Sequence, residues 1–398
     1  MKNIIITGGE LFNKGAQAMV FITVDEMKKR FPDHHIYVLS EMDNKRPEEE
    51  KMQYTFDFLG WYPESFAKAQ NSFLVRFACL FKHHKEFKKC ESIYRNTDLM
   101  IDISGYALGS IWSNNCNKLY LNNLRFAKEY NIPVYLMPQS FGPFDFEEQK
   151  RNDIAEDIRE LLPYCSAICA REKEGFEELR LKYNLNNIFL KSDLVLNNKS
   201  IDYSNIYRSA PKILLPEIHE NSVAVIPNKQ LEKVKANLSL KHVYNHLIKN
   251  VLKNGYHIYL ISHSSGDHSL NKEIKEGFAD ENRVHLIDKE LSSVEFNEML
   301  SSFDFLIASR YHAIVHAYKK VVPCLVLGWA TKYRELTSLF HQEQYYFDCR
   351  EEISEEAINN ALKTLIQNRK TETTKIGKEL NEIQKENIFD IIGKEKSL

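Results

Sequence analysis

The sequence predicts an α/β protein built from two doubly wound domains. Short apolar runs, typical of buried strands, alternate with segments of helical periodicity, and this alternation is characteristic of parallel sheets covered on both faces. A polar, irregular stretch at residues 197–215 separates two such series. The length of 398 residues also fits two domains, since one domain commonly contains roughly 100–200 residues.

The first series defines an N-terminal Rossmann-like domain, which we place at residues 1–197. Its unit is a strand, a loop and a helix that leads to the next parallel strand. Predicted strands are 3–7, 35–40, 98–103, 133–137, 167–170 and 188–191, and predicted helices are 16–30, 118–130, 147–162 and 172–183.

The second series defines a C-terminal Rossmann-like domain at residues 216–350. A charged helical tail, 351–398, follows it and is expected to pack back on the first domain. Two such domains place a ligand cleft between the carboxyl ends of their strands. Predicted strands are 222–226, 257–262, 284–287, 305–308 and 323–327, and predicted helices are 240–254, 271–278, 293–302 and 311–319.

Composition narrows the function and the compartment. The formal net charge of −2 disfavours nucleic acid as the main partner. Seven irregularly spaced cysteines predict free thiols in a reducing compartment rather than a disulfide framework. No signal-peptide core or membrane-spanning run is evident, so we expect a cytoplasmic protein.

Residues 72–85 combine an apolar stretch with a basic cluster, Lys82-His83-His84-Lys85. Such a segment is typical either of a core helix with a solvated basic end or of a helix that lies on an anionic membrane. The first interpretation is favoured, and the second allows peripheral contact with the inner face of a membrane.

The most informative motif is Ser309-Arg310-Tyr311-His312, which follows an apolar strand and opens a helix. A helix N-terminus attracts anions through its free backbone N–H groups and its dipole. Arg310 adds a permanent positive charge, and His312 adds a group that exchanges a proton near neutral pH. The motif therefore predicts an anion site with acid–base capacity.

Other loops follow predicted strands at the same edge of the sheets. Each one alone is explained almost as well by a tight turn or a surface ion pair, but several on one edge favour a binding site. Arg171 suits the capture of phosphate or carboxylate. The candidate substrate-binding residues are Asn13, Lys14, Gly15, Ser104, Gly105, Tyr106, Gln139, Ser140, Ser309, Tyr311 and Lys332.

No motif predicts a metal site. The sequence has no D-x-D motif for a nucleotide-bound metal. His312 and His316 have a spacing that can hold zinc, but Ala313 replaces the glutamate of the zinc-protease motif and no third ligand is near. We therefore predict a site without metal.

Taken in order, these motifs resemble the polysaccharide pyruvyl transferase family. The resemblance extends from residue 4 to about residue 340 and is strongest at 309–313, with weaker matches at 13–19, 138–143, Arg171, 322–323 and Lys332. It implies a two-domain fold like that of GT-B glycosyltransferases. It also implies an enzyme that moves pyruvate from phosphoenolpyruvate onto a sugar as a ketal and releases phosphate.

The resemblance further implies that phosphoenolpyruvate, as donor substrate and without another cofactor, lies against Arg171, Arg310 and His312. Two arginines suit a ligand with both a carboxylate and a phosphate. We assign His312 as the candidate general acid, or as donor to the leaving phosphate. The acceptor is expected to be a sugar or a glycan precursor of the cell envelope or an exopolysaccharide. Its identity, any lipid link and the oligomeric state stay open.

Two features depart from the family pattern. Many members carry an aspartate where this chain has Ala16, and Tyr106 stands in a loop that is usually richer in glycine. Tyr106 is suited to stacking on a sugar ring. Two alternatives remain: a metal-independent GT-B glycosyltransferase that uses a nucleotide sugar, and a catalytically idle glycan-binding protein on the same fold.

Overall fold

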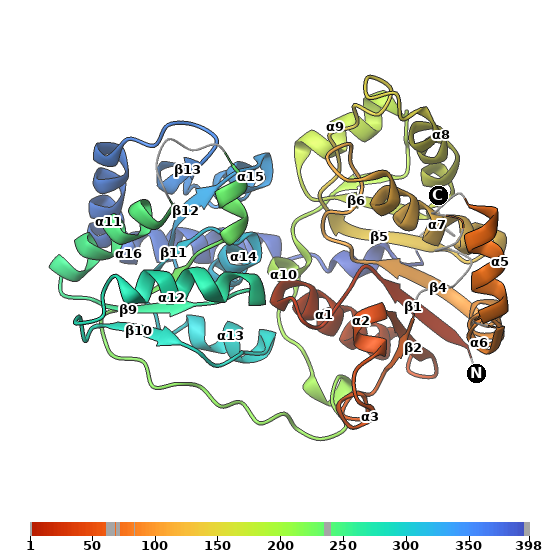
Figure 1. Ribbon diagram of the computed structural model, residues 1–398, viewed down its shortest axis with the longest axis horizontal. Helices are drawn as coiled ribbons and strands as arrows, with labels where there is room; N and C mark the ends of the chain where they lie inside the picture. The colour runs from red at the N-terminus through yellow and green to blue at the C-terminus, as the bar shows by residue number, and fades with distance from the viewer. Residues whose placement is uncertain (1, 61–67, 69–71, 83, 235–239, 394–398) are drawn as a thin grey trace.

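The computed structural model describes residues 2–60, 68, 72–82, 84–234 and 240–393. It contains two α/β domains side by side, each built on a wholly parallel sheet (Figure 1). The predicted fold class, two Rossmann-like domains in a GT-B-like arrangement, is therefore confirmed.

The first sheet has the strand order β3-β2-β1-β4-β5-β6-β7. The centre of strand β1 is apolar, and Ile4, Ile5 and Ile6 have no exposed surface, as expected for a strand covered on both faces. Strand β1 pairs with both β2 and β4, so the order reverses there and a crevice opens beyond the carboxyl ends of β1 and β4. The strands are β1 (Asn3–Thr7), β2 (His35–Leu39), β3 (Asp57–Leu59), β4 (Thr97–Asp102), β5 (Val134–Gln139), β6 (Ala167–Ala170) and β7 (Ile188–Leu190).

The helices of this domain connect successive strands. They are α1 (Lys14–Arg30), α2 (Glu41–Asn44), α3 (Glu48–Lys51), α5 (Phe73–Lys82), α6 (His84–Arg95), α7 (Asn114–Glu129), α8 (Asn152–Leu161), α9 (Lys173–Lys182) and α10 (Leu194–Asn197). Helix α1 begins at an N-cap, Asn13, whose side chain accepts the N–H groups of Gly15 and Ala16.

The second sheet has the order β10-β9-β8-β11-β12-β13 and reverses between β8 and β11. Its strands are β8 (Ser222–Ile226), β9 (His257–Ile261), β10 (Val284–Ile287), β11 (Phe305–Ala308), β12 (Cys324–Gly328) and β13 (Tyr346–Asp348). Its longer helices are α11 (Leu240–Lys253), α12 (His268–Glu276), α13 (Ser293–Leu300), α14 (Tyr311–Lys319), α15 (Thr331–Leu339) and α16 (Glu355–Ile383).

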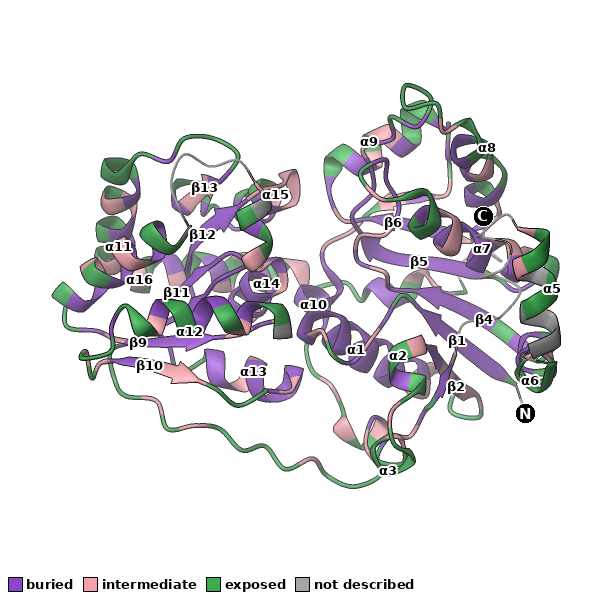
Figure 2. Ribbon diagram, in the orientation of Figure 1, coloured by how far each residue is buried: buried purple, intermediate pink, exposed green. Residues whose placement is uncertain are grey.

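The two domains share one apolar core, because buried side chains of α1 and α10 pack against those of α13 and α14. Figure 2 shows that these helices are largely buried where the domains meet. Polar contacts reinforce this interface. Lys14 Nζ donates to the backbone oxygen of His263 at 3.3 Å, and Gln17 Oε1 accepts the N–H of Ser293 at 2.6 Å.

The tail returns to the first domain at the end of α16. The Asn197 side-chain amide donates to the backbone oxygens of Ile383 and Glu386 at 2.9 and 2.7 Å. Arg30 forms an ion pair with Asp390 at 2.7 Å. The chain therefore crosses between the domains twice, once through the segment after α10 and once through α16.

Helix α5 differs from the favoured sequence interpretation. Phe73 and Leu74 are each 78% exposed and Phe77 is 60% exposed, so the core-helix interpretation is wrong for this face. Residue 83 of the same segment lies outside the described residues. None of the helices that the structure describes is both long enough and apolar enough to span a bilayer.

Candidate active site

A cavity of about 160 Å³ opens between the two domains. Its wall on the first domain comes from the loops after β1, β4 and β6 and from the start of α1. Its wall on the second domain comes from the starts of α14 and α15. It is lined by Gly8, Glu10, Asn13, Ala16, Met19, Ser104, Gly105, Tyr106, Arg171, Tyr311, His312 and Lys332.

Arg171 lies in this wall but is held by protein groups. Its Nε and Nη1 donate to Glu172 and Asp193 at 2.9 and 2.8 Å, and its Nη2 donates to Ser140 Oγ at 2.6 Å. The guanidinium also stacks over the Tyr311 ring of the other domain, 4.3 Å from its centroid. Two buried carboxylates thus neutralise Arg171, so its main effect is to join the domains and fix the cavity wall.

His312 meets Arg171 through a shared carboxylate. The His312 Nε2 atom lies 3.9 Å from Asp193 Oδ2 and has no hydrogen-bond partner among the described residues. Burial lowers the pKa of His312 to about 4; Asp193 opposes this shift, whereas Arg171 and Lys332 add to it. The imidazole is therefore neutral at pH 7, and its Nε2 is a buried polar atom that lacks a hydrogen bond among the described residues.

Lys332 is the cation of the cavity that lacks an acidic partner. Its Nζ lies 4.9 Å from the ring centroid of Tyr106, 5.3 Å from that of Tyr311 and 5.7 Å from that of Trp329. No described carboxylate forms an ion pair with it. Burial and the neighbouring Arg171 lower its pKa to about 8, so at pH 7 it is still mainly charged.

Arg310 is placed differently from the sequence expectation. It forms a two-pronged ion pair with buried Asp267, with contacts of 2.8 and 2.5 Å, and it does not line the cavity. Asp267 also accepts the backbone N–H groups of Lys229 and Ser264. The pair therefore organises loops of the second domain in this structure.

Five other predicted contacts are also absent from the cavity wall; Lys14 and Gly15 are described below, and the remaining three are Gln139, Ser140 and Ser309. Gln139 is fully buried and donates to Asp102 at 2.9 Å. Ser140 lies behind Arg171, which it helps to hold. Ser309 is fully buried and its hydroxyl bonds Tyr244. Their side chains satisfy internal polar groups and do not line this cavity.

The Asn13-Lys14-Gly15 turn lies where the domains meet. Asn13 lines the cavity, while Lys14 spans the interface. Gly15 faces the His312 ring so closely that a Cβ on Gly15 would be 2.3 Å from His312 Cγ. Glycine is required at this position because the imidazole occupies the space of any side chain.

Ser104, Gly105 and Tyr106 also line the cavity. The Ser104 hydroxyl donates to Asp102 at 2.8 Å, and the Tyr106 hydroxyl donates to the backbone oxygen of Gly142 at 2.8 Å. These hydrogen bonds fix the loop, and the Tyr106 ring faces Lys332.

Two acidic residues of the site were missed by sequence reasoning. Asp193, the N-cap of α10, links Arg171 to His312. Glu10 lines the cavity, and burial together with the charge of Asp43 raises its pKa from 4.5 to about 7. The only sequence signal for Glu10 was its position in the turn after a central strand. This signal is weak, because a lone glutamate in a turn is usually solvated.

Comparisons of whole structures show where this fold occurs. A UDP-N-acetylglucosamine 2-epimerase matches with a TM-score of 0.56 and 15% identity over 98% of this chain and 96% of its own. The UDP-GlcNAc 2-epimerase from Methanocaldococcus jannaschii matches with a TM-score of 0.52 and 12% identity over 92% of each chain. The glycotransferase of kitacinnamycin matches with a TM-score of 0.54 and 10% identity over 98% of this chain and 97% of its own. At these identities the likeness establishes the fold alone.

The family comparison goes further, because it covers most of the chain. The model of the family described as polysaccharide pyruvyl transferase matches residues 13–331, which include the Asn13 turn, Arg171, His312 and the start of α15. The chain is thus a transferase, and it belongs to the polysaccharide pyruvyl transferase family.

Proposed function

We propose that this protein transfers pyruvate from phosphoenolpyruvate to two hydroxyls of a glycan, forming a cyclic ketal and releasing phosphate. The observation that carries the proposal is Lys332, a cation held among aromatic rings in the interdomain cavity without an acidic partner among the described residues. Such a group is ready to bind an anionic donor substrate.

The charges around the cavity assign distinct roles to the cations. Arg171 is already neutralised by Glu172 and Asp193, so it supports the site more than it attracts a ligand. Lys332 and the free His312 Nε2 remain to contact the carboxylate or phosphate. A bound anion would raise the pKa of His312, which would then donate a proton toward the leaving phosphate.

Glu10 is suited to the other proton transfers. Its pKa of about 7 keeps a substantial protonated fraction at neutral pH, and a nearby anionic substrate would raise that fraction. Protonated Glu10 would give its proton to the methylene carbon of phosphoenolpyruvate while the first sugar hydroxyl adds to C2. The resulting carboxylate would then take the proton of that hydroxyl.

The second step closes the ring. The second hydroxyl attacks C2 and the bond between C2 and the phosphate oxygen breaks. His312 gives its proton to the departing phosphate, and the proton of this hydroxyl restores protonated His312. One proton enters the methyl group and two leave the hydroxyls, so phosphate departs as the monohydrogen ion and the reaction balances without a metal or redox partner.

A glycan acceptor is implied by the family, and the exposed face of α5 suggests how a lipid-linked one would be reached. Phe73, Leu74 and Phe77 of α5 are exposed, and the neighbouring helix α6 carries exposed basic residues such as Lys85 and Lys88. Apolar and basic side chains together favour an anionic membrane surface.

The deciding experiment incubates the protein with phosphoenolpyruvate and a panel of glycan acceptors and measures phosphate release. We expect release only when an acceptor with two suitably spaced hydroxyls is present. Lys332→Met should raise the KM for phosphoenolpyruvate at least tenfold, whereas Lys363→Met, at an exposed position of α16, should leave it unchanged. An unchanged KM in Lys332→Met would refute the assignment of the anion site.

Thermal shift separates this function from the nucleotide-sugar alternative. A ligand that binds the folded state raises the melting temperature. We expect phosphoenolpyruvate to raise it and UDP-sugars to leave it unchanged. The reverse pattern would favour a glycosyltransferase, and a response to the glycan alone would favour the idle glycan-binding protein.

A further inference from the structure

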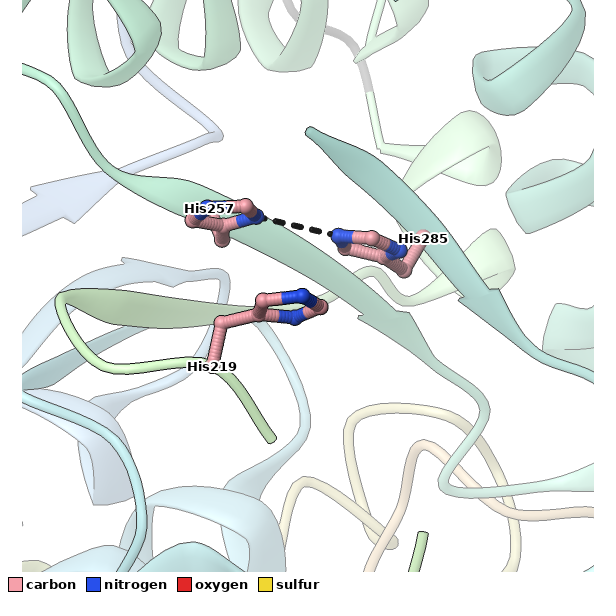
Figure 3. Close-up of side chains that lie close together, drawn as sticks. All are labelled: His219, His257 and His285. Atoms are coloured by element: carbon pink, nitrogen blue, oxygen red, sulfur yellow. Dashed lines mark hydrogen bonds between the residues drawn. The ribbon is translucent and has the colours of Figure 1, made fainter. Parts of the chain in front are cut away.

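A cluster of three histidines lies at the amino-terminal edge of the second sheet, opposite the edge that faces the cavity (Figure 3). His257 is the first residue of β9, His285 is the second residue of β10, and His219 lies three residues before β8. One possible ligand nitrogen from each ring lies within 4.8 Å of the others.

The contact between His257 and His285 has a spacing close to that of a metal site. His257 Nδ1 and His285 Nε2 face one another at 3.1 Å. Two nitrogens bound to one tetrahedral zinc ion at about 2.0–2.1 Å would be about 3.3–3.4 Å apart. The two lone pairs repel unless a proton or a cation lies between them, so this pair is preformed for either one.

His219 completes the set from the segment that leads out of the interdomain connection. Its Nδ1 is bonded to the Tyr259 hydroxyl at 2.7 Å, and its backbone N–H donates to the same oxygen at 3.1 Å. When Nδ1 carries the ring proton, this bond leaves Nε2 as the ligand atom, as in many metal-binding histidines.

The ring arrangement defines the one movement that ligation requires. His219 stacks on His257 with centroids 4.3 Å apart and planes at 2°, and metal–imidazole bonds lie in the ring plane. His219 must therefore tilt about its χ2 torsion to aim Nε2 at a shared ion. This torsion is broad in histidine, so the tilt needs no change of backbone.

The chemistry of the cluster favours borderline transition metals. Three imidazoles without a carboxylate suit Zn²⁺, Ni²⁺ or Cu²⁺ and disfavour Mg²⁺ and Ca²⁺.

We propose that His219, His257 and His285 bind one divalent transition metal ion, with zinc as the expected occupant and water as the fourth ligand. The ion would fasten the end of the interdomain segment to β9 and to the edge strand β10. It would stabilise the second domain and take no part in chemistry at the distant cavity.

The test uses the full-length protein after treatment with a chelator, titrated with ZnCl₂ in a calorimeter. We expect one zinc per chain in the native sequence. Each of His219→Gln, His257→Gln and His285→Gln should weaken binding at least tenfold. The matched control is His242→Gln/His246→Gln, which removes another stacked histidine pair, on α11.

Two further measurements keep the outcome decisive. Circular dichroism checks that each variant is folded, and Co²⁺ added in place of zinc gives a visible absorption band that reports nitrogen coordination. The proposal is overturned if the native chain binds no zinc, if the three variants bind as tightly as the native chain, or if only the α11 control loses binding. Because no readout depends on turnover, its failure is separate from failure of the proposed transfer activity.

Discussion

Replacing Glu10 by glutamine tests both the electrostatics of the cavity and the proposed proton transfer. Burial is the main cause that raises the pKa of this carboxyl from 4.5 to about 7, and Asp43 adds to it. A shift of that size corresponds to at most about 3.5 kcal/mol, at about 1.4 kcal/mol per pKa unit. Because the side chain is partly exposed, solvent screening reduces the expected cost to about 1–2 kcal/mol.

The sign of the effect follows from the two protonation states. Below pH 4.5 the carboxyl is protonated in both folded and unfolded chains, so it costs nothing. The cost grows as the pH rises from 4.5 and is complete above pH 7, where the folded chain must hold a buried carboxylate. Glu10→Gln should therefore be more stable than the native protein by about 1–2 kcal/mol at pH 8, with the gain shrinking toward pH 4.5.

Urea unfolding at several pH values measures the stability, and phosphate release measures the activity. If protonated Glu10 starts the reaction, the native kcat/KM should fall above pH 7 and the variant should lose at least about 100-fold in kcat. Glu49→Gln, at an exposed position of α3, is the control. A variant with native turnover and an unchanged fall above pH 7 would refute the catalytic role, and equal stability at pH 8 would refute the burial argument.

Three other perturbations address the rest of the site. Gly15→Ala should force the His312 ring aside, lowering kcat/KM for phosphoenolpyruvate while costing about 1–3 kcal/mol of stability, and native kinetics would contradict this packing. Arg171→Ala should lower the free energy of unfolding by about 3–5 kcal/mol in urea unfolding, because it leaves the buried Asp193 carboxylate without its ion-pair partner. The prediction is contradicted if the free energy of unfolding falls less than in a variant of an exposed arginine. Anionic vesicles should carry the native chain into the pellet on sedimentation. A variant in which the exposed apolar residues of α5, Phe73, Leu74 and Phe77, are changed to serine should stay in the supernatant. Equal sedimentation of both proteins would exclude this face as a membrane contact.

The fold class followed from the sequence because buried parallel strands leave a strong local pattern. Runs such as Ile4-Ile5-Ile6 need no distant partner to be recognised. Strands β3 and β13 escaped notice because each has three residues at a sheet edge, where neither length nor periodicity is informative. The exposure of the apolar face of α5 was not predicted either, because an apolar run has the same sequence pattern whether it is buried or exposed to solvent.

The site was less predictable because side-chain pairing is decided by the fold. The position of Arg310 after a strand correctly marked a charged junction, but its partner Asp267 is 43 residues away and the sequence offers no link between them. The same holds for Asp193, which joins Arg171 to His312. The raised pKa of Glu10 arises from burial and from the charge of Asp43, and neither can be inferred from the sequence of a turn.

The double crossing between the domains has a mechanical consequence. A chain that passes from one domain to the other once can swing about a single point in any direction. Here the segment after α10 and the end of α16 are fastened together at Asn197, so both tethers converge on one place. We therefore expect any opening of the cavity to be a hinge rotation about Asn197, which would separate Arg171 from the Tyr311 ring on the far side of the interface.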